Sequence, residues 1–168
     1  MRAHVTLALM LTACGDKAEE PYAFEEGTYE VAFDEVDTTS CGYEAVALNA
    51  DAREVGVTET LDGMRYTYPD ATTDQDSVDC ALVGADFDCD ALTASQDITG
   101  NGFDAVITLS LAQSGTWTDP GAHDGSFTYT FTCEGDDCLD GGLDGSVYGP
   151  DATFPCDVSG TYSAVKAG

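Results

Sequence analysis

The alternation of apolar and polar residues is the feature that most limits how this chain can fold. From Gly27 onward, large apolar side chains recur at every second position within short stretches. A period of two places neighbouring side chains on opposite faces of an extended strand, so each stretch is typical of an antiparallel strand with one buried face. The clearest stretches are Tyr29 to Phe33, Val55 to Val57, Met64 to Tyr68, Phe103 to Leu111 and Phe127 to Cys133.

Turn-forming residues separate these stretches, for example Pro69-Asp70 and Asn101-Gly102. Clusters of Gly, Pro, Asn and Asp end strands and begin turns. The only candidate for a helix is the short stretch at residues 43–53. We therefore expect an all-β antiparallel domain of about 8–10 strands, folded as a small β-barrel or as a β-sandwich.

A triplet of glycine, any residue and an aromatic residue opens the first expected strand at Gly27-Thr28-Tyr29. It recurs at Gly115-Thr116-Trp117 and Gly160-Thr161-Tyr162. The first triplet resembles the one at the head of the first strand in lipocalins. That resemblance implies a barrel whose aromatic residues line a cavity for a small apolar ligand. The alternative is that the same aromatic residues form a packed core.

The chain has seven cysteines, six of them after Cys14. An even number in an exported chain indicates disulfides rather than free thiols. A two-residue turn at Gly84-Ala85 places Cys80 opposite Cys89 across a hairpin, and a turn-like tetrapeptide separates Cys133 from Cys138. The remaining pair is Cys41–Cys156. A zinc site is disfavoured because no two cysteines have the C-x2-C spacing.

The pair Cys41–Cys156 also bears on the choice between barrel and sandwich. Cys41 follows the first expected strand, and Cys156 precedes the last one, Gly160 to Lys166. A disulfide between them places the first strand beside the last. A closed barrel requires that neighbourhood, although a sandwich also permits it.

The charge of the chain excludes several classes of partner. It has 32 acidic and five basic residues, a formal net charge of −27. Such a surface repels phosphates, so we expect no nucleic-acid partner and no direct docking on anionic lipid headgroups. The acidity fits a need for solubility, or else a basic partner or calcium.

The first sixteen residues have the parts of an export signal. Arg2 precedes an apolar run from Val5 to Leu11, and Leu11-Thr12-Ala13-Cys14 follows. The run is far shorter than the about 20 residues that cross a bilayer. One interpretation of these residues is an ordinary signal peptide cleaved at Ala13, with Cys14 as a spare thiol.

These residues resemble the signal peptide and lipobox of bacterial lipoproteins, in which the lipobox cysteine is acylated and becomes the first residue of the mature chain. The resemblance implies a signal peptide at 1–13, a lipidated tether at 14–26 and a β domain at 27–168. Acyl chains on Cys14 would then hold the protein on a membrane. In enterobacterial lipoproteins an aspartate directly after the cysteine favours the inner membrane. Here that place is Gly15, and Asp16 comes one later, so the outer membrane is favoured.

Few residues suggest catalysis. After the signal, His123 is the only histidine, and it lies in the turn-rich stretch Asp-Pro-Gly-Ala-His-Asp-Gly, so we expect a solvated loop residue. Its neighbour Asp124 does not by itself make a Ser-His-Asp triad. Pairs of carboxylates at a suitable distance are unavoidable among 32 acids and carry little information.

The stretch from Asp97 to Asp104 resembles a calcium-binding loop of the EF-hand or dockerin type. Asp97, Thr99 and Asn101 match the first, third and fifth ligand positions, and Asp104 lies near the later ones. The bidentate acid that completes such a site is missing, since Thr108 occupies its position. A β-hairpin that turns at Asn101-Gly102 is therefore favoured over a calcium site.

The sequence thus predicts a membrane-anchored, disulfide-bonded lipoprotein with a structural or binding role, no catalytic residues and no required cofactor. The two alternatives are a lipocalin-like carrier of a small apolar ligand and a hydrolase that uses carboxylates. The protein or small-molecule partner is not identified by any motif.

Overall fold

The computed structural model describes residues 22–41, 53–68, 77–99, 104–138 and 154–168. These residues form nine strands and two short 3-10 helices, η1 (Thr39–Cys41) and η4 (Asp136–Cys138). Strands with large apolar residues at alternate positions are what the sequence predicted. The strands are β1 (Gly27–Asp37), β2 (Arg53–Glu59), β3 (Gly63–Thr67), β4 (Ser77–Val83), β5 (Asp86–Cys89), β6 (Leu92–Asp97), β7 (Val106–Asp119), β8 (Ala122–Glu134) and β9 (Cys156–Lys166).

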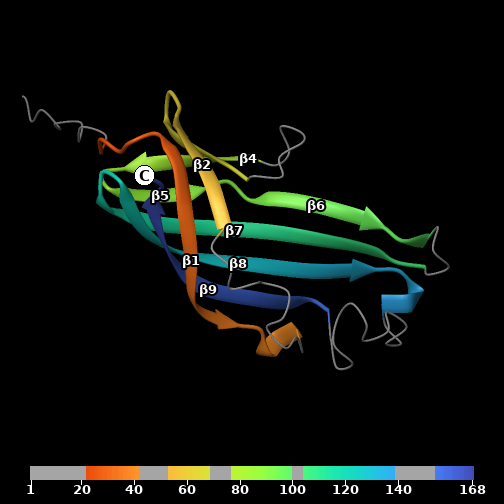
Figure 1. Cartoon of the computed structure of the whole chain (residues 1–168). Helices are drawn as coiled ribbons and strands as arrows, with labels where there is room; N and C mark the ends of the chain where they lie inside the picture. Colours follow the sequence, from red (N-terminus) through yellow and green to blue (C-terminus); the bar gives the residue numbers. More distant parts are fainter. Residues whose placement is uncertain (1–21, 42–52, 69–76, 100–103, 139–153) are drawn as a thin grey trace, which may run out of the picture.

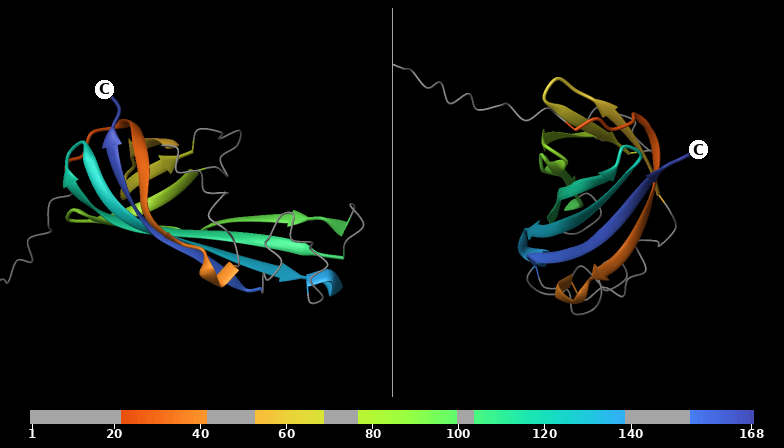
Figure 2. Two further views of the ribbon diagram at one scale, coloured as in Figure 1. Left: turned by 60° about the horizontal axis from the view of Figure 1, so that its bottom comes forward. Right: turned by 90° about the vertical axis from the view of Figure 1, so that its left-hand side faces the viewer.

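Eight of these strands close into an antiparallel barrel (Figure 1). The strand order is β5-β4-β3-β2-β1-β9-β8-β7, and β5 pairs with β7 to complete the ring. The view along the molecule in Figure 2 (right) shows the strands arranged around this ring. The ninth strand, β6, pairs with the first half of β7, where β7 extends beyond the barrel.

The first and last strands lie side by side, as a closed barrel requires. β1 pairs with β9 in antiparallel register from Tyr29 opposite Lys166 to Asp37 opposite Ser159. The register shifts between Phe33 and Val36, which marks a β-bulge in β1. The sandwich that the sequence left open is therefore excluded, and the barrel is the fold.

The three predicted disulfides are all present. They join Cys41 to Cys156, Cys80 to Cys89 and Cys133 to Cys138. The predicted hairpin register holds, with Cys80 opposite Cys89 and Val83 opposite Asp86. Gly84 takes a φ of 61°, the conformation that a two-residue turn with glycine first requires.

The barrel interior is filled by side chains from all around the ring. Tyr29, Val57, Met64 and His123 are fully buried, and Phe87, Trp117, Phe127 and Tyr162 are nearly so. Gly115 of β7 lies directly opposite Gly125 of β8. A Cβ at Gly115 would lie 2.5 Å from the ring of Phe87, and one at Gly125 would lie 2.4 Å from the ring of Tyr162. These two glycines therefore make room for rings that fill the interior.

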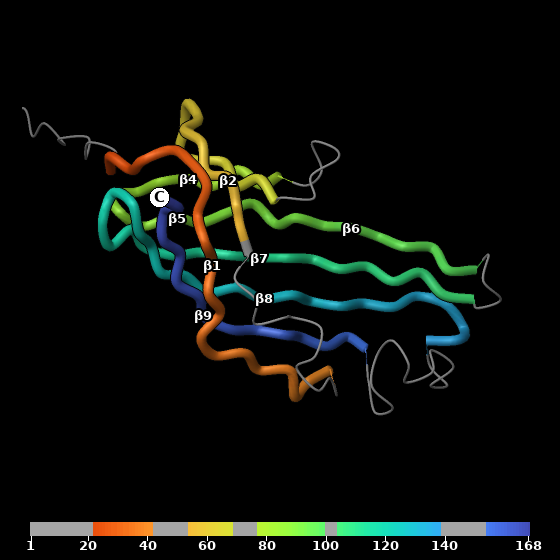
Figure 3. The backbone as a smooth tube through the Cα atoms, in the orientation of Figure 1, coloured from red at the N-terminus to blue at the C-terminus, as the bar shows by residue number. Residues whose placement is uncertain are grey.

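The chain path in Figure 3 places residues 22–26 across the end of the barrel at the β7–β8 turn. The rings of Tyr22 and Phe24 stack on Trp117, and the backbone N–H of Glu25 donates to the carbonyl of Pro120. Tyr22, Phe24 and Glu25, which the expected tether at 14–26 includes, therefore pack against the barrel, and residues 14–21 lie outside the described ranges. Among the described residues, no helix has the length and apolar character needed to span a bilayer. Residues 42–52, which hold most of the candidate helix, lie outside the described ranges; Arg53 begins β2.

Candidate functional site

His123 lies inside the barrel, which corrects the expectation of a solvated loop residue. It belongs to β8, pairs with Trp117 across the β7–β8 hairpin and has no exposed surface. The hairpin turns at Pro120-Gly121, so the strand begins before His123. Counting back by twos from buried Phe127 leads through Gly125 to His123, and this period was the signal that the turn-like composition concealed.

Aromatic rings surround His123 on several sides. Its ring centroid lies 4.6 Å from that of Trp117, 5.5 Å from those of Phe87 and Tyr29, and 6.0 Å from that of Tyr162. The hydroxyl of Tyr66 forms a hydrogen bond with Nε2 of His123. Residues from β1, β3, β5, β7, β8 and β9 thus meet at one imidazole, and rings occupy the space around it.

Burial controls the protonation of this cluster. Burial lowers the pKa of His123 to about 4 and raises the pKa of Tyr162 to about 12. Burial also raises the pKa of Tyr66 well above its usual value. At neutral pH these groups are therefore uncharged. A neutral, enclosed imidazole does not reach a dissolved substrate.

Three buried polar atoms in the interior have no hydrogen-bond partner among the described residues. They are Nε1 of Trp117, Nδ1 of His123 and the hydroxyl oxygen of Tyr162. A buried polar group without a partner costs about 1–3 kcal/mol. Side chains thus fill the interior, but three of its buried polar atoms have no hydrogen-bond partner among the described residues.

The candidate calcium ligands are only partly described. Asp97 ends β6, and its carboxylate accepts hydrogen bonds from the hydroxyl and backbone N–H of Thr99, which lower its pKa. The backbone N–H of Asp104 donates to the carboxylate of Asp137. Asn101 lies outside the described ranges. The described residues contain no cluster of three metal-binding side chains, and the calcium site stays a prediction.

The antiparallel pairing of β6 with β7 agrees with the favoured hairpin, with Asp97 opposite Val106. Its turn at Asn101-Gly102 falls outside the described ranges, as does the expected lipidation site at Cys14.

The outward surface of β6 to β9 carries hydroxyl side chains in register. One row across the strands is Ser95, Thr108 and Thr132, and the next is Thr93, Ser110 and Thr130. We call this surface the hydroxyl face. It consists of Thr93, Ser95, Thr108, Ser110, Ser114, Ser126, Thr128, Thr130, Thr132, Ser159, Thr161 and Ser163. Sequence reasoning missed it because it assigned these residues only to the polar side of separate strands.

The outward surface on the other side of the barrel also carries acidic side chains. Its outward positions include Glu30 on β1, Glu54 on β2, Asp79 on β4 and Asp88 on β5. Acids also stand among the hydroxyls of β8 and β9, since Asp157 lies opposite Thr130 and Asp124 lies opposite Ser163. On β1, Asp37 lies opposite Ser159. Carboxylates therefore lie on both sides of the barrel, and the side formed by β6 to β9 carries hydroxyl side chains between them.

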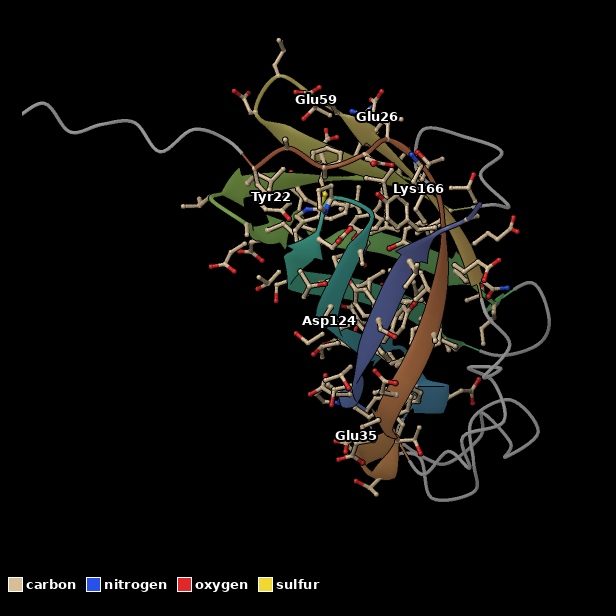
Figure 4. All side chains as sticks on the ribbon, turned by 60° about the vertical axis from the view of Figure 1, so that its left-hand side comes forward. Tyr22, Glu26, Glu35, Glu59, Asp124 and Lys166 are labelled. Carbon is tan, nitrogen blue, oxygen red and sulfur yellow. A yellow bond between two sulfur atoms is a disulfide. The ribbon has the colours of Figure 1, made fainter. Side chains whose placement is uncertain are left out.

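A hollow of about 400 Å³ lies within the hydroxyl face, beside the bulge in β1. The bulge brings Glu35 and Asp37 to its rim, where the hydroxyls of Ser126, Thr128 and Thr161 also line it. Bulges re-aim side chains and recur beside binding sites. Figure 4 shows Glu35 on β1 far from Tyr22 and Lys166, which mark the opposite end of the barrel.

Gly160 allows close packing beneath the hollow. A Cβ there would lie 2.2 Å from the carbonyl oxygen of Glu35 and 2.9 Å from the ring of Phe127. Glycine thus lets the bulged strand, the Phe127 ring and β9 approach one another at the floor. The Thr39 hydroxyl and backbone N–H donate to Oδ1 of Asp37 at 2.7 and 2.9 Å, and they lower its pKa, which keeps the carboxylate ionised. The hollow thus offers charged carboxylates that accept hydrogen bonds, beside neutral hydroxyls that both donate and accept them.

The fold and site define a closed, eight-stranded antiparallel barrel with three disulfides and a polar hollow on one outer face. Comparison with protein-family models, curated proteins and solved structures finds no match.

Proposed function

We propose that the protein is an exported lipoprotein, anchored to a bacterial membrane through acyl chains on Cys14, with a non-enzymatic binding role. The observation that carries this proposal is the pairing of the cysteines. Six of the seven cysteines form three disulfides, and Cys14 is the one left over. Disulfides persist in oxidising compartments outside the cytosol, which is where an export signal leads.

The interior of the barrel supports binding rather than catalysis. The single histidine of the barrel is enclosed, uncharged at neutral pH and surrounded by rings. A general base has to reach the proton that it removes, directly or through a water molecule. Among the described residues, hydroxyls and carboxylates that face solvent line the outer hollow, and these groups suit hydrogen bonding to a ligand.

A carrier of small apolar ligands is the second candidate, and the closed barrel of eight strands is the observation that favours it. Such a barrel is just wide enough to hold side chains or one small ligand. The rings of Tyr29, Tyr66, Phe87 and Trp117 lie around His123 where that ligand would lie. We therefore place the binding role on the outer surface.

Membrane partition of the full chain tests the anchor. In a bacterial host with lipoprotein-processing enzymes, the protein is expected in the membrane fraction and in the detergent phase after extraction. The Cys14→Ser variant, which keeps the size of the side chain, is expected in the soluble periplasmic fraction with its disulfides intact. A wild-type protein that fractionates like Cys14→Ser would contradict the proposal.

A further inference from the structure

We propose that the open edge of β6 binds an extended, positively charged segment of a partner protein, which adds to the sheet as a further strand. The inference deepens the binding role proposed above and rests on it. It names the surface, the mode of contact and the chemistry of the partner.

β6 lies at the edge of the part of the sheet that extends beyond the barrel (Figure 1). Among the described residues it pairs with β7 alone, from Leu92 opposite Leu111 to Asp97 opposite Val106. All residues of β6 except Leu92 are exposed. The long side of β6 that points away from β7 therefore faces no other strand of the described part of the chain.

The register shows which backbone groups of β6 point to this open side. In an antiparallel pair, directly opposite residues alternate between those that exchange two hydrogen bonds and those that exchange none. The N–H of Ile98 donates to the carbonyl of Ala105, which fixes this alternation for β6 and β7. The N–H and C=O groups of Thr93, Ser95 and Asp97 therefore point away from β7, where no backbone group of the described residues pairs with them.

The open edge of β6 lacks the features that usually protect such an edge from other chains. Charged side chains, proline residues and bulges commonly protect edge strands. The stretch from Leu92 to Gln96 contains no charged residue and no proline, and its register with β7 is unbroken. An edge of this kind is a template for a further strand, and main-chain hydrogen bonds supply the affinity in this mode of recognition.

Carboxylates at both ends of this uncharged stretch select the charge of the partner. Asp90 precedes β6 and Asp97 ends it, and both are exposed. The hydroxyl and backbone N–H of Thr99 donate to the carboxylate of Asp97, which lowers its pKa and keeps it ionised. Opposite charges on neighbouring strands attract and like charges repel. A segment with lysine or arginine near its ends therefore complements the edge, and the net charge of −27 attracts such a segment from a distance.

Charge also disfavours a second copy of this chain as the added strand. Antiparallel pairing of two β6 strands about Ser95 would bring Asp97 of each copy toward the end where the other copy carries Asp90. Each copy has 32 acidic and five basic residues. Two such surfaces repel each other, so a basic partner is favoured over self-association.

Binding of synthetic heptapeptides to the full chain in non-ionic detergent tests the proposal. One peptide alternates valine and threonine between two terminal lysines, and a comparison peptide carries glutamate in place of lysine. Fluorescence anisotropy should show that the lysine peptide binds, more weakly as NaCl is added, and that the glutamate peptide does not. The lysine peptide with N-methyl groups on its valines and threonines lacks their N–H donors and should not bind.

Two variants at Ser95 separate the backbone from the side chain. Ser95→Pro removes an N–H that points to the open side and none that bonds to β7, a position where an edge strand tolerates proline. Its affinity for the lysine peptide should fall at least about tenfold. Ser95→Ala also loses the hydroxyl that pairs with Thr108, but it keeps the N–H and should bind like wild type.

Hydrogen exchange in the wild-type protein gives a readout that needs no variant. The amides of Thr93 and Ser95 should exchange more slowly when the lysine peptide is bound. The amide of Ala94, which bonds to β7, should change little.

Several outcomes would overturn the inference. These are no binding of the lysine peptide, equal binding of its N-methylated form or of the glutamate peptide, or equal affinity of Ser95→Pro and Ser95→Ala. A dimer of the full chain that Ser95→Pro abolishes, seen by light scattering, would instead make the edge a contact between two copies. Intact mass of the same preparation reports Cys14 acylation separately, so a failed anchor and a failed peptide site give different results.

Discussion

At the scale of single residues, a hydrogen bond joins the hydroxyl of Tyr66 to Nε2 of His123 in the barrel interior. Removing one partner of a buried hydrogen bond leaves the other unsatisfied, whereas removing both with similar shapes retained can be nearly neutral. We expect His123→Phe to lower the free energy of unfolding by about 1–3 kcal/mol. The double variant His123→Phe/Tyr66→Phe should regain most of that loss.

Fluorescence of Trp117 during urea unfolding measures the unfolding free energies of these variants. Trp117 is the only tryptophan and is buried against His123, so its emission reports on the barrel interior. A double variant less stable than His123→Phe would show that the two side chains do not act as a pair.

Protonation of His123 gives a pH dependence with a defined sign. Its pKa is about 4 in the folded protein and about 6.5 when unfolded, so the unfolded chain binds more protons between these values. The contribution to stability is complete above about pH 6.5 and is lost as pH falls through about 4. The expected loss is about 3 kcal/mol.

Comparing wild type with the double variant isolates this effect from the titration of the many carboxylates. The difference in unfolding free energy between the two proteins should shift by that amount from pH 7.5 to pH 4. A difference independent of pH would mean that His123 is not held neutral by burial.

At the scale of strands and hairpins, two disulfides close loops of different length. They should therefore contribute differently to the free energy of unfolding. Cys41–Cys156 spans 115 residues, and Cys80–Cys89 spans nine. From loop entropy, the first stabilises by about 5 kcal/mol and the second by about 2.5 kcal/mol. Cys41→Ala/Cys156→Ala should therefore lower the unfolding free energy more than Cys80→Ala/Cys89→Ala. Equal losses would contradict the view that the first pair acts by joining β1 to β9.

The sequence predicted those strands and pairings that depend on local pattern. Alternation marks β1, β3 and the core of β8, and the Gly84 turn sets the register of Cys80 against Cys89. It failed for His123, because Gly125 interrupts the apolar alternation and the preceding turn residues extend into the strand. Gly125 leaves room for the ring of Tyr162, which comes from β9. No local sequence pattern reveals this contact between two strands.

The candidate site was beyond sequence reasoning for a related reason. Thr128 and Thr161 are both polar positions on half-buried strands. No local sequence pattern indicates that they line the same hollow. The bulge that re-aims Glu35 depends on the register of β1 against β9. The hydroxyl face exists only once the order of four strands is known.

At the scale of the whole molecule, the net charge of −27 opposes compaction by self-repulsion. Two exposed ion pairs, Arg65–Asp79 and Lys166–Glu25, offset little of it. Raising NaCl from about 0.01 M to about 0.5 M screens charges beyond a few ångströms. We expect the Tm at pH 7 to rise by about 3–8 °C. A Tm that falls with added salt would mean that attractive pairs outweigh repulsion.

In our proposal, acyl chains on Cys14 hold the barrel on a membrane and three disulfides stabilise it. Intact mass of the protein extracted from host membranes measures both at once. The account predicts a chain that begins at an acylated Cys14 and is lighter than the reduced form by the hydrogens of three disulfides. An unmodified chain that begins before or after Cys14, or one that retains free thiols among the six paired cysteines, would contradict it.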